Sequence, residues 1–196
     1  MLYNARFAFR QHPRLEGTHA FLSASQPYWL RYTEDKLIER LTSAQAAAKG
    51  TRLHETAARC ISDGIELRED GRYPILALYV NHAIEFGMTP EQMLFYSANA
   101  YGTADAISFD EMESFLRIHD LKTGLSKVTM DQLYVYAAFF CLEYGYKPFQ
   151  IHGELRVYQG DTITEEILNR SYLSEIYDTI LMANAVIEEH TNGGVI

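Results

Sequence analysis

Two strand-like segments with a short polar connection between them constrain this chain more than any other feature. The connection is Asp110–Ser114, and its length is typical of a β-hairpin. The segment before it contains Asp105, and the segment after it contains Asp120 and Lys122. A hairpin would therefore bring Asp105 beside the other two side chains.

The second segment also determines which way its polar side chains point. Because strand side chains alternate between faces, Asp120 and Lys122 share one face and Leu121 points to the core. The neighbouring residues are mostly apolar, which favours a buried strand over the alternative of a solvated ion pair. Burying two carboxylates and an amine without a ligand is costly, so we expect these groups to bind a divalent cation and a water.

A helix is expected next, over about Thr129–Tyr144, with Ser126 or Thr129 as its cap. Gln132 and Tyr136 are four residues apart and so lie on one face of this helix. From that face they could hold a phosphate, the amine of Lys122 or a water.

Three short motifs in this order resemble the PD-(D/E)XK nuclease superfamily, specifically its RecB-type branch. In that branch an Asp follows a GxxD-like strand start, a D-x-K triplet occupies the next strand, and Q-x-x-x-Y opens the following helix. The matching residues are Gly102–Asp105, Asp120–Lys122 and Gln132–Tyr136. The triplet alone is a weak signal, whereas all three motifs on the expected elements are a strong one.

A fourth motif lies upstream. RecB-type nucleases carry G-x-x-x-H in the first core helix, and Gly50–His54 matches it. A lone helical histidine is usually just a hydrogen-bonded residue, but the downstream motifs favour a metal ligand. Glu55 lies about 100° further round the helix and is a secondary candidate.

The resemblance implies an α/β fold with a PD-(D/E)XK (restriction-endonuclease-like) core, a mixed central sheet flanked by helices, and extra N- and C-terminal helices. It covers about residues 50–136, and the strand–helix pattern extends it to about 158. We expect one nuclease domain over residues 1–196, with a catalytic core at about 44–158 and a C-terminal helix at 160–190. A half-buried strand over 149–158 would complete the core.

The resemblance also implies a Mg²⁺ or Mn²⁺ site. Asp105 and Asp120 would be its central ligands, with His54 and the backbone carbonyl of Leu121 as further ones. An imidazole ligand favours Mn²⁺. Some relatives have an acidic residue on the preceding strand, expected here over Met93–Ala100. Asn99 lies nearest, so a second metal position stays open.

The remaining motif residues would act directly on the reaction. Lys122 would orient or deprotonate the attacking water and neutralise developing charge. The expected catalytic set is Asp105, Asp120, Lys122, Gln132 and Tyr136. Several relatives hold a four-cysteine iron–sulfur cluster, which the two cysteines of this chain cannot supply.

Charge and composition limit the partners. The net charge of −9 argues against a passive nucleic-acid coat, although residues 1–60 are net basic. A local basic track could still guide DNA. Its candidate members are Arg31, Lys36, Lys49, Arg52, Lys127 and Lys147. We find no membrane-spanning run and no signal-peptide pattern, and so expect a cytoplasmic protein, in the host cytoplasm if phage-encoded.

The sequence therefore predicts a metal-dependent DNA nuclease, and specifically an exonuclease of recombination or repair similar to small phage-type enzymes. Its partners would be double- or single-stranded DNA, with a homo-oligomer and a recombination partner protein as further options. Two alternatives remain: a structure- or site-specific endonuclease on the same fold, and a non-catalytic DNA-binding module.

Overall fold

The computed structural model describes residues 20–25, 27–124 and 127–192. The chain divides into two compact units, residues 1–47 and 48–196. Most of the predicted catalytic core falls in the second unit, and so does every residue of the candidate site. Within the described ranges, no helix has the length and apolar character needed to cross a bilayer.

The first unit contains a short 3-10 helix, η2 (Pro27–Arg31), and the first part of α1 (Glu34–Asp63). The Thr33 hydroxyl caps α1 by accepting a hydrogen bond from the Lys36 backbone N–H at 3.3 Å. From Ala48 onward α1 belongs to the second unit.

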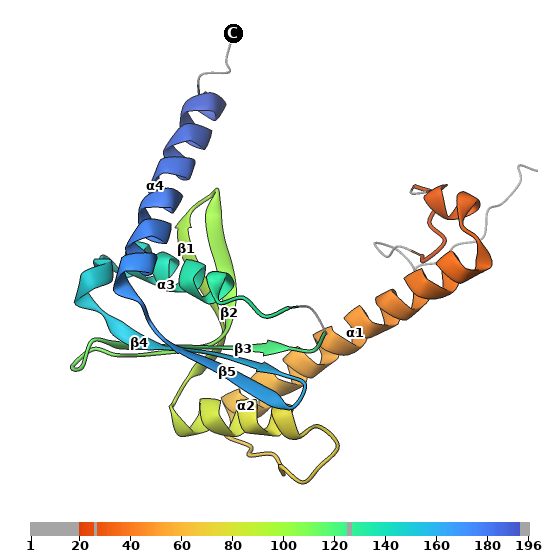
Figure 1. The fold of residues 1–196 in the computed structure, drawn as a ribbon, viewed down its shortest axis with the longest axis horizontal. Helices are drawn as coiled ribbons and strands as arrows, with labels where there is room; N and C mark the ends of the chain where they lie inside the picture. Colours follow the sequence, from red (N-terminus) through yellow and green to blue (C-terminus); the bar gives the residue numbers. More distant parts are fainter. Residues whose placement is uncertain (1–19, 26, 125–126, 193–196) are drawn as a thin grey trace, which may run out of the picture. The chain divides into compact units, whose positions relative to one another are not determined.

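A five-stranded mixed sheet forms the centre of the second unit (Figure 1). Its strands lie in the order β1-β2-β3-β4-β5. Neighbouring strands run antiparallel except β3 and β4, which are parallel and are connected through α3 (Asp131–Tyr144). The strands are β1 (Thr89–Ser97), β2 (Ala100–Asp110), β3 (Phe115–Lys122), β4 (His152–Gln159) and β5 (Thr162–Ile167). The predicted α/β class with a mixed, helix-flanked sheet is confirmed at this level.

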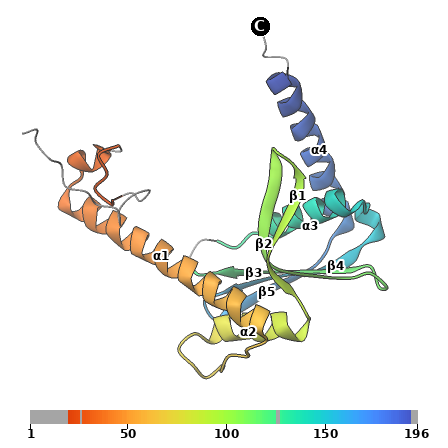
Figure 2. The ribbon, with the colours of Figure 1, turned by 180° about the vertical axis from the view of Figure 1, so that it is seen from behind.

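Helices cover both faces of the sheet. The second part of α1 packs with α2 (Pro74–Glu85) on one face, around Ala57, Val80 and Leu121. On the other face, α3 and α4 (Arg170–Asn192) enclose a larger core around Leu116, Tyr134 and Leu173. Figures 1 and 2 show α2 and the α3–α4 pair on opposite sides of the sheet.

The last third of the chain differs from its sequence prediction. The expected strand at 149–158 begins only at His152, after a 3-10 turn, η3 (Pro148–Gln150), that leaves Phe149 exposed. The expected C-terminal helix also begins later, because Thr162–Ile167 pairs with β4 as a strand. Asn169 then caps α4 by accepting hydrogen bonds from the N–H groups of the next turn.

The start of α3 also differs. The helix begins at Asp131, and Met130 at its N-cap makes no side-chain capping bond, so Thr129 does not cap it. Ser126 lies outside the described residues. The helix ends at Gly145, whose φ of 76° is a left-handed conformation that glycine adopts without strain.

Candidate metal-binding site

The candidate site lies where β2 and β3 separate. Their ladder runs from Asp110 opposite Phe115 to Ala106 opposite His119, and stops there. One residue further, Asp105 Oδ2 accepts a hydrogen bond from the Leu121 backbone N–H at 2.9 Å. A carboxylate thus occupies the gap between the two strands, close to Asp120 as the sequence predicts.

Asp120 and Lys122 form one end of a polar chain that reaches α3. Lys122 Nζ donates to Asp120 Oδ1 at 3.1 Å and to Gln132 Oε1 at 2.6 Å. Gln132 Nε2 in turn donates to the Tyr136 hydroxyl at 3.0 Å. The structure therefore brings these four predicted residues together, and the helix holds the amine in a defined position.

His54 reaches the same place from α1. Its Nδ1 lies 3.4 Å from Asp105 Oδ2. The helix can approach this closely because position 50 is a glycine: a β-carbon there would stand 2.6 Å from Thr123 Oγ1. The glycine of the G-x-x-x-H motif thus gives α1 the room that the histidine needs.

Gly102 plays a similar part on β2. A β-carbon at this position would stand 3.0 Å from Cε1 of Tyr136. The glycine lets the Tyr136 ring lie against the strand that carries Asp105. Both motif glycines therefore act through close packing.

A further acidic residue, Glu91, joins the site. Ligand atoms of His54, Glu91 and Asp105 all lie within 4.8 Å of one another. Glu91 has a φ of 49°, a left-handed conformation that is uncommon for a residue with a β-carbon. Sequence reasoning missed Glu91 because it started this strand at Met93, whereas β1 starts at Thr89.

One signal could have identified Glu91. Glu91 is the nearest acidic residue upstream of Met93, directly after Pro90, and extending the expected strand over both would have included it. Proline is tolerated in an edge strand, and β1 is the edge strand of this sheet.

The other predicted residues are placed as follows. The Leu121 side chain is buried against α1 and α2. Its carbonyl points to the same side of β3 as its N–H, which faces Asp105. Glu55 is exposed on α1 and, among the described residues, is not one of those lining the cavity at the site.

That cavity has a volume of about 320 Å³ and opens to solvent. Its lining residues are His54, Asp105, Asp120, Leu121, Lys122, Thr123, Gly124, Gln132 and Gln159. The space is large enough for a cation with several waters.

The electrostatics of the site favour a cation. Burial and the neighbouring Asp105 raise the pKa of Asp120, and Lys122 only partly opposes this. Partial burial and Asp105 likewise raise the pKa of Glu91. The hydrogen bond to Asp105 raises the pKa of His54. Without a metal, the site therefore tends to take up protons, which a divalent cation would displace.

The donor set fits a hard or borderline divalent cation. It offers one imidazole nitrogen and several carboxylate oxygens. Asp120 Oδ2 lies 3.0 Å from Lys122 Nζ, yet within the described part of the chain it accepts no hydrogen bond of favourable geometry. This buried oxygen therefore keeps a lone pair available.

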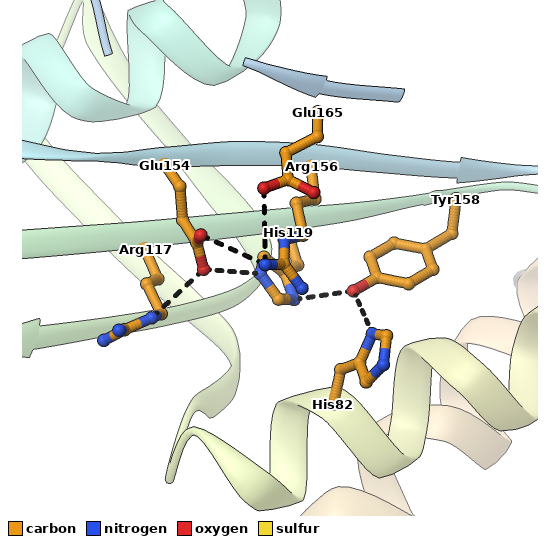
Figure 3. Close-up of polar contacts among 7 residues, drawn as sticks. All are labelled: His82, Arg117, His119, Glu154, Arg156, Tyr158 and Glu165. Carbon is orange, nitrogen blue, oxygen red and sulfur yellow. Dashed lines mark hydrogen bonds and ion pairs between the residues drawn. The ribbon is translucent and has the colours of Figure 1, made fainter. Parts of the chain in front are cut away.

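A buried polar network lies on the face of β3 that carries Arg117 and His119 (Figure 3). Alternation along the strand places Asp120 on the opposite face. The Tyr158 hydroxyl lies 2.8 Å from His82 Nδ1 and 3.3 Å from His119 Nδ1. Glu154 sits between Arg117 and Arg156, at 3.1 Å from each. The network ties β3 to β4 and α2, and so fixes the strand from which Asp120 projects.

Three members of the predicted basic track have partners within the chain, and one of them, Lys36, pairs with Glu39 at 2.9 Å. Lys49 lies over the ring of Tyr73, and Lys147 over the ring of Tyr177, with 5.3 Å and 5.5 Å from Nζ to ring centroid. Such contacts stabilise the fold by themselves. The basic track stays a prediction.

Comparisons with known proteins add little to the geometry. No protein-family model matches the chain, and a search of curated proteins finds no match. Among solved structures, the crystal structure of SSO0001 aligns with 80% of this chain and 68% of that chain, at 15% identity and a TM-score of 0.35. A likeness of this size supports no statement about function.

Proposed function

We propose that this chain is a metal-dependent deoxyribonuclease of the PD-(D/E)XK superfamily, RecB-type branch. The proposal rests on the group of side chains at the point where β2 and β3 separate. There Asp105, His54 and Glu91 converge beside a buried Asp120 whose partner is Lys122. The sequence motifs of that branch name four of these five residues.

The proposed cofactor is Mg²⁺ or Mn²⁺, held by His54, Asp105 and Asp120, with the Leu121 carbonyl and Glu91 as further donors. The imidazole favours Mn²⁺ over Mg²⁺. When bound, such a cation supplies a Lewis acid and lowers the pKa of a coordinated water.

The chain's own residues would do the rest. Lys122 is about one-third exposed, so its amine can hold a water and a phosphate oxygen while Asp120 and Gln132 fix its position. In the hydrolysis the water oxygen bonds to phosphorus, and the bond to the bridging oxygen breaks. The water gives up a proton, and the departing oxygen gains one.

A digestion assay tests this proposal. The wild-type protein should degrade linear DNA with Mg²⁺ or Mn²⁺ and lose this activity in EDTA. Asp120→Asn and Lys122→Ala should each abolish it, whereas Glu55→Gln, on the exposed side of α1, should retain it. If both site variants degrade DNA as well as the wild type, the proposal is wrong.

Within this activity we propose an exonuclease that acts in recombination or repair. Covalently closed circular DNA separates it from an endonuclease, because a closed circle has no end from which to start. If the closed circle is cut as fast as the linear duplex, the enzyme is an endonuclease and the exonuclease proposal is wrong. Labels at the 5′ and 3′ ends of the linear duplex would then report the polarity of digestion.

A further inference from the structure

The β1–β2 hairpin carries a ladder of three side-chain pairs that starts at the candidate site. Glu91 and Asp105 form the first pair, within the metal-ligating group. Met93 and Thr103 are directly opposite one another in the hairpin, and the Thr103 hydroxyl lies 3.9 Å from the Met93 sulfur. The third pair is Phe95 and Tyr101.

The third pair ends the ladder with two stacked rings. Phe95 and Tyr101 are paired across the strands, with 6.3 Å between ring centroids and 26° between ring planes. Both remain half-exposed, at 50% and 58%. Two aromatic side chains left this open are a sizeable apolar surface that the fold itself does not cover.

The second and third pairs lie on one face of the hairpin. The register is constant from Gln92 opposite Ala104 to Phe95 opposite Tyr101, so alternation keeps positions 93 and 95 on the same side. The left-handed Glu91 stands at the end of this run, beside Asp105. The opposite face packs against α3, through Leu94 and Gly102. The exposed face is thus a continuous stripe leading from metal ligands to aromatic rings.

The dimensions of the stripe suit a nucleic-acid strand. The first pair lies four positions from the third, a distance of about 13 Å along an extended strand. A stacked strand with a rise of about 3.4 Å per nucleotide covers this distance in roughly four nucleotides. Beyond the metal ligands the stripe carries no charged side chain, so it suits bases better than phosphates.

We propose that Phe95 and Tyr101 stack against unpaired bases of the strand whose phosphodiester bond lies at the Asp105–Asp120 site. This inference rests on the proposed nuclease function and specifies its substrate. The enzyme would act on a single-stranded segment, and the aromatic pair would hold that segment a few nucleotides from the bond that is cut. Stacking on aromatic rings tolerates any base, so the surface would add affinity without sequence preference.

Two substrates of different length test the proposal. A thymidine dinucleotide reaches only the metal-binding site, whereas a thymidylate dodecamer also reaches the aromatic pair. Phe95→Ala and Tyr101→Ala should each raise the KM for the dodecamer about tenfold or more, and leave hydrolysis of the dinucleotide unchanged. The conservative variants Phe95→Tyr and Tyr101→Phe should keep the wild-type KM, since a ring remains.

Phe149→Ala is the matched control. Phe149 is 71% exposed on η3, so its removal should affect neither substrate. If the dodecamer KM stays at the wild-type value in both Phe95→Ala and Tyr101→Ala, the inference is overturned while the nuclease proposal stands. If these two variants instead change only the oligomeric state, the stripe binds a second copy of the chain, and the inference is equally overturned.

A binding measurement keeps the two proposals separate. A dodecamer containing 2-aminopurine is titrated with protein in Ca²⁺, where binding does not depend on turnover. Stacking of 2-aminopurine on an aromatic ring should quench its fluorescence. Quenching that is present in the wild type and disappears in Phe95→Ala and Tyr101→Ala supports stacking, even if the wild type hydrolyses nothing and the nuclease proposal fails. Quenching that is unchanged in these variants, or absent from the wild type, overturns the stacking inference.

Discussion

Gly153 on β4 lies directly opposite Leu116 on β3, and a β-carbon at position 153 would overlap the Leu116 carbonyl oxygen. Backbone atoms cannot rotate out of the way as a side chain can. This contact lies in the parallel ladder that holds β3, the strand of Asp120 and Lys122. The close approach of these two strands thus depends on a glycine that belongs to none of the sequence motifs.

Replacing this glycine should therefore disrupt the fold. We expect Gly153→Ala to lower the free energy of unfolding by more than about 3 kcal/mol, because the sheet must open to admit the methyl group. Urea unfolding followed by circular dichroism measures this. Gly124→Ala is the control, since a β-carbon at position 124 meets nothing within 4 Å. Equal stability of the two variants would contradict the expectation.

Glu91 should show a conflict between stability and metal binding. Glu91→Gly removes a left-handed non-glycine residue and a carboxylate beside Asp105, so we expect the metal-free protein to gain about 1 kcal/mol. The same change should weaken Mn²⁺ binding at least about tenfold, since losing an outer-sphere partner alone costs that much. Thermal unfolding in EDTA and calorimetric titration with Mn²⁺ measure the two effects.

Ser114→Gly provides the comparison for Glu91. Ser114 has a φ of 48° in the β2–β3 turn, away from the site. The Ser114→Gly variant should therefore be more stable than the wild type and bind Mn²⁺ with the same affinity. If Glu91→Gly binds Mn²⁺ as tightly as Ser114→Gly does, Glu91 is not a ligand.

The hairpin of Asp105 and Asp120 could be predicted because its signals are local. Alternation of side chains and the length of the connection at 110–114 fix the pairing without reference to the rest of the chain. Glu91 lies beyond these two signals, because it follows a proline and its left-handed φ of 49° interrupts the alternation of side chains.

The sequence prediction for the C-terminal part was wrong for a related reason. Residues 162–167 have no long apolar pattern of their own, and they form β5 because β4 offers a free edge with which to pair. That edge exists only after α3 has returned the chain to the sheet. The strand is thus determined by tertiary pairing, whereas α4 follows from the apolar spacing that the sequence shows.

Removing the charge of Asp120 should stabilise the metal-free protein. The pKa of Asp120 is raised in the fold by burial and by Asp105, above the unfolded value of 3.8. The ionised carboxylate therefore destabilises the fold at neutral pH, and this penalty vanishes as the pH falls below 3.8. We expect Asp120→Asn in EDTA to unfold at a higher temperature than the wild type at pH 7, and the difference to shrink on acidification.

Metal should reverse that order. Mn²⁺ should raise the unfolding temperature of the wild type through binding to the folded state, but leave Asp120→Asn unchanged. Asp178→Asn, an exposed change on α4, should respond to Mn²⁺ as the wild type does. If Mn²⁺ raises the unfolding temperature of Asp120→Asn as much as that of the wild type and of Asp178→Asn, Asp120 is not a metal ligand.

The network behind β3 should make the fold acid-sensitive. The pKa of Glu154 is lowered to about 2 by its neighbours. These are His119, whose Nε2 lies 3.9 Å from Glu154 Oε1, and the guanidinium groups of Arg156 and Arg117. Because an unfolded glutamate titrates near 4.5, this stabilisation is complete above that pH and is lost as the pH falls toward 2. Burial also lowers the pKa of His119, and charging this imidazole in acid opposes folding in the same direction.

Glu154→Gln isolates the carboxylate contribution. The variant should be less stable than the wild type at pH 7, because two arginines lose their charged partner, and its stability should fall less between pH 4.5 and 2. Urea unfolding over this pH range gives both quantities. Glu188→Gln, on α4, is the control and should retain the steep acid dependence. If Glu154→Gln and the wild type lose stability in parallel below pH 4.5, the acid sensitivity arises from other carboxylates, and the network does not set it.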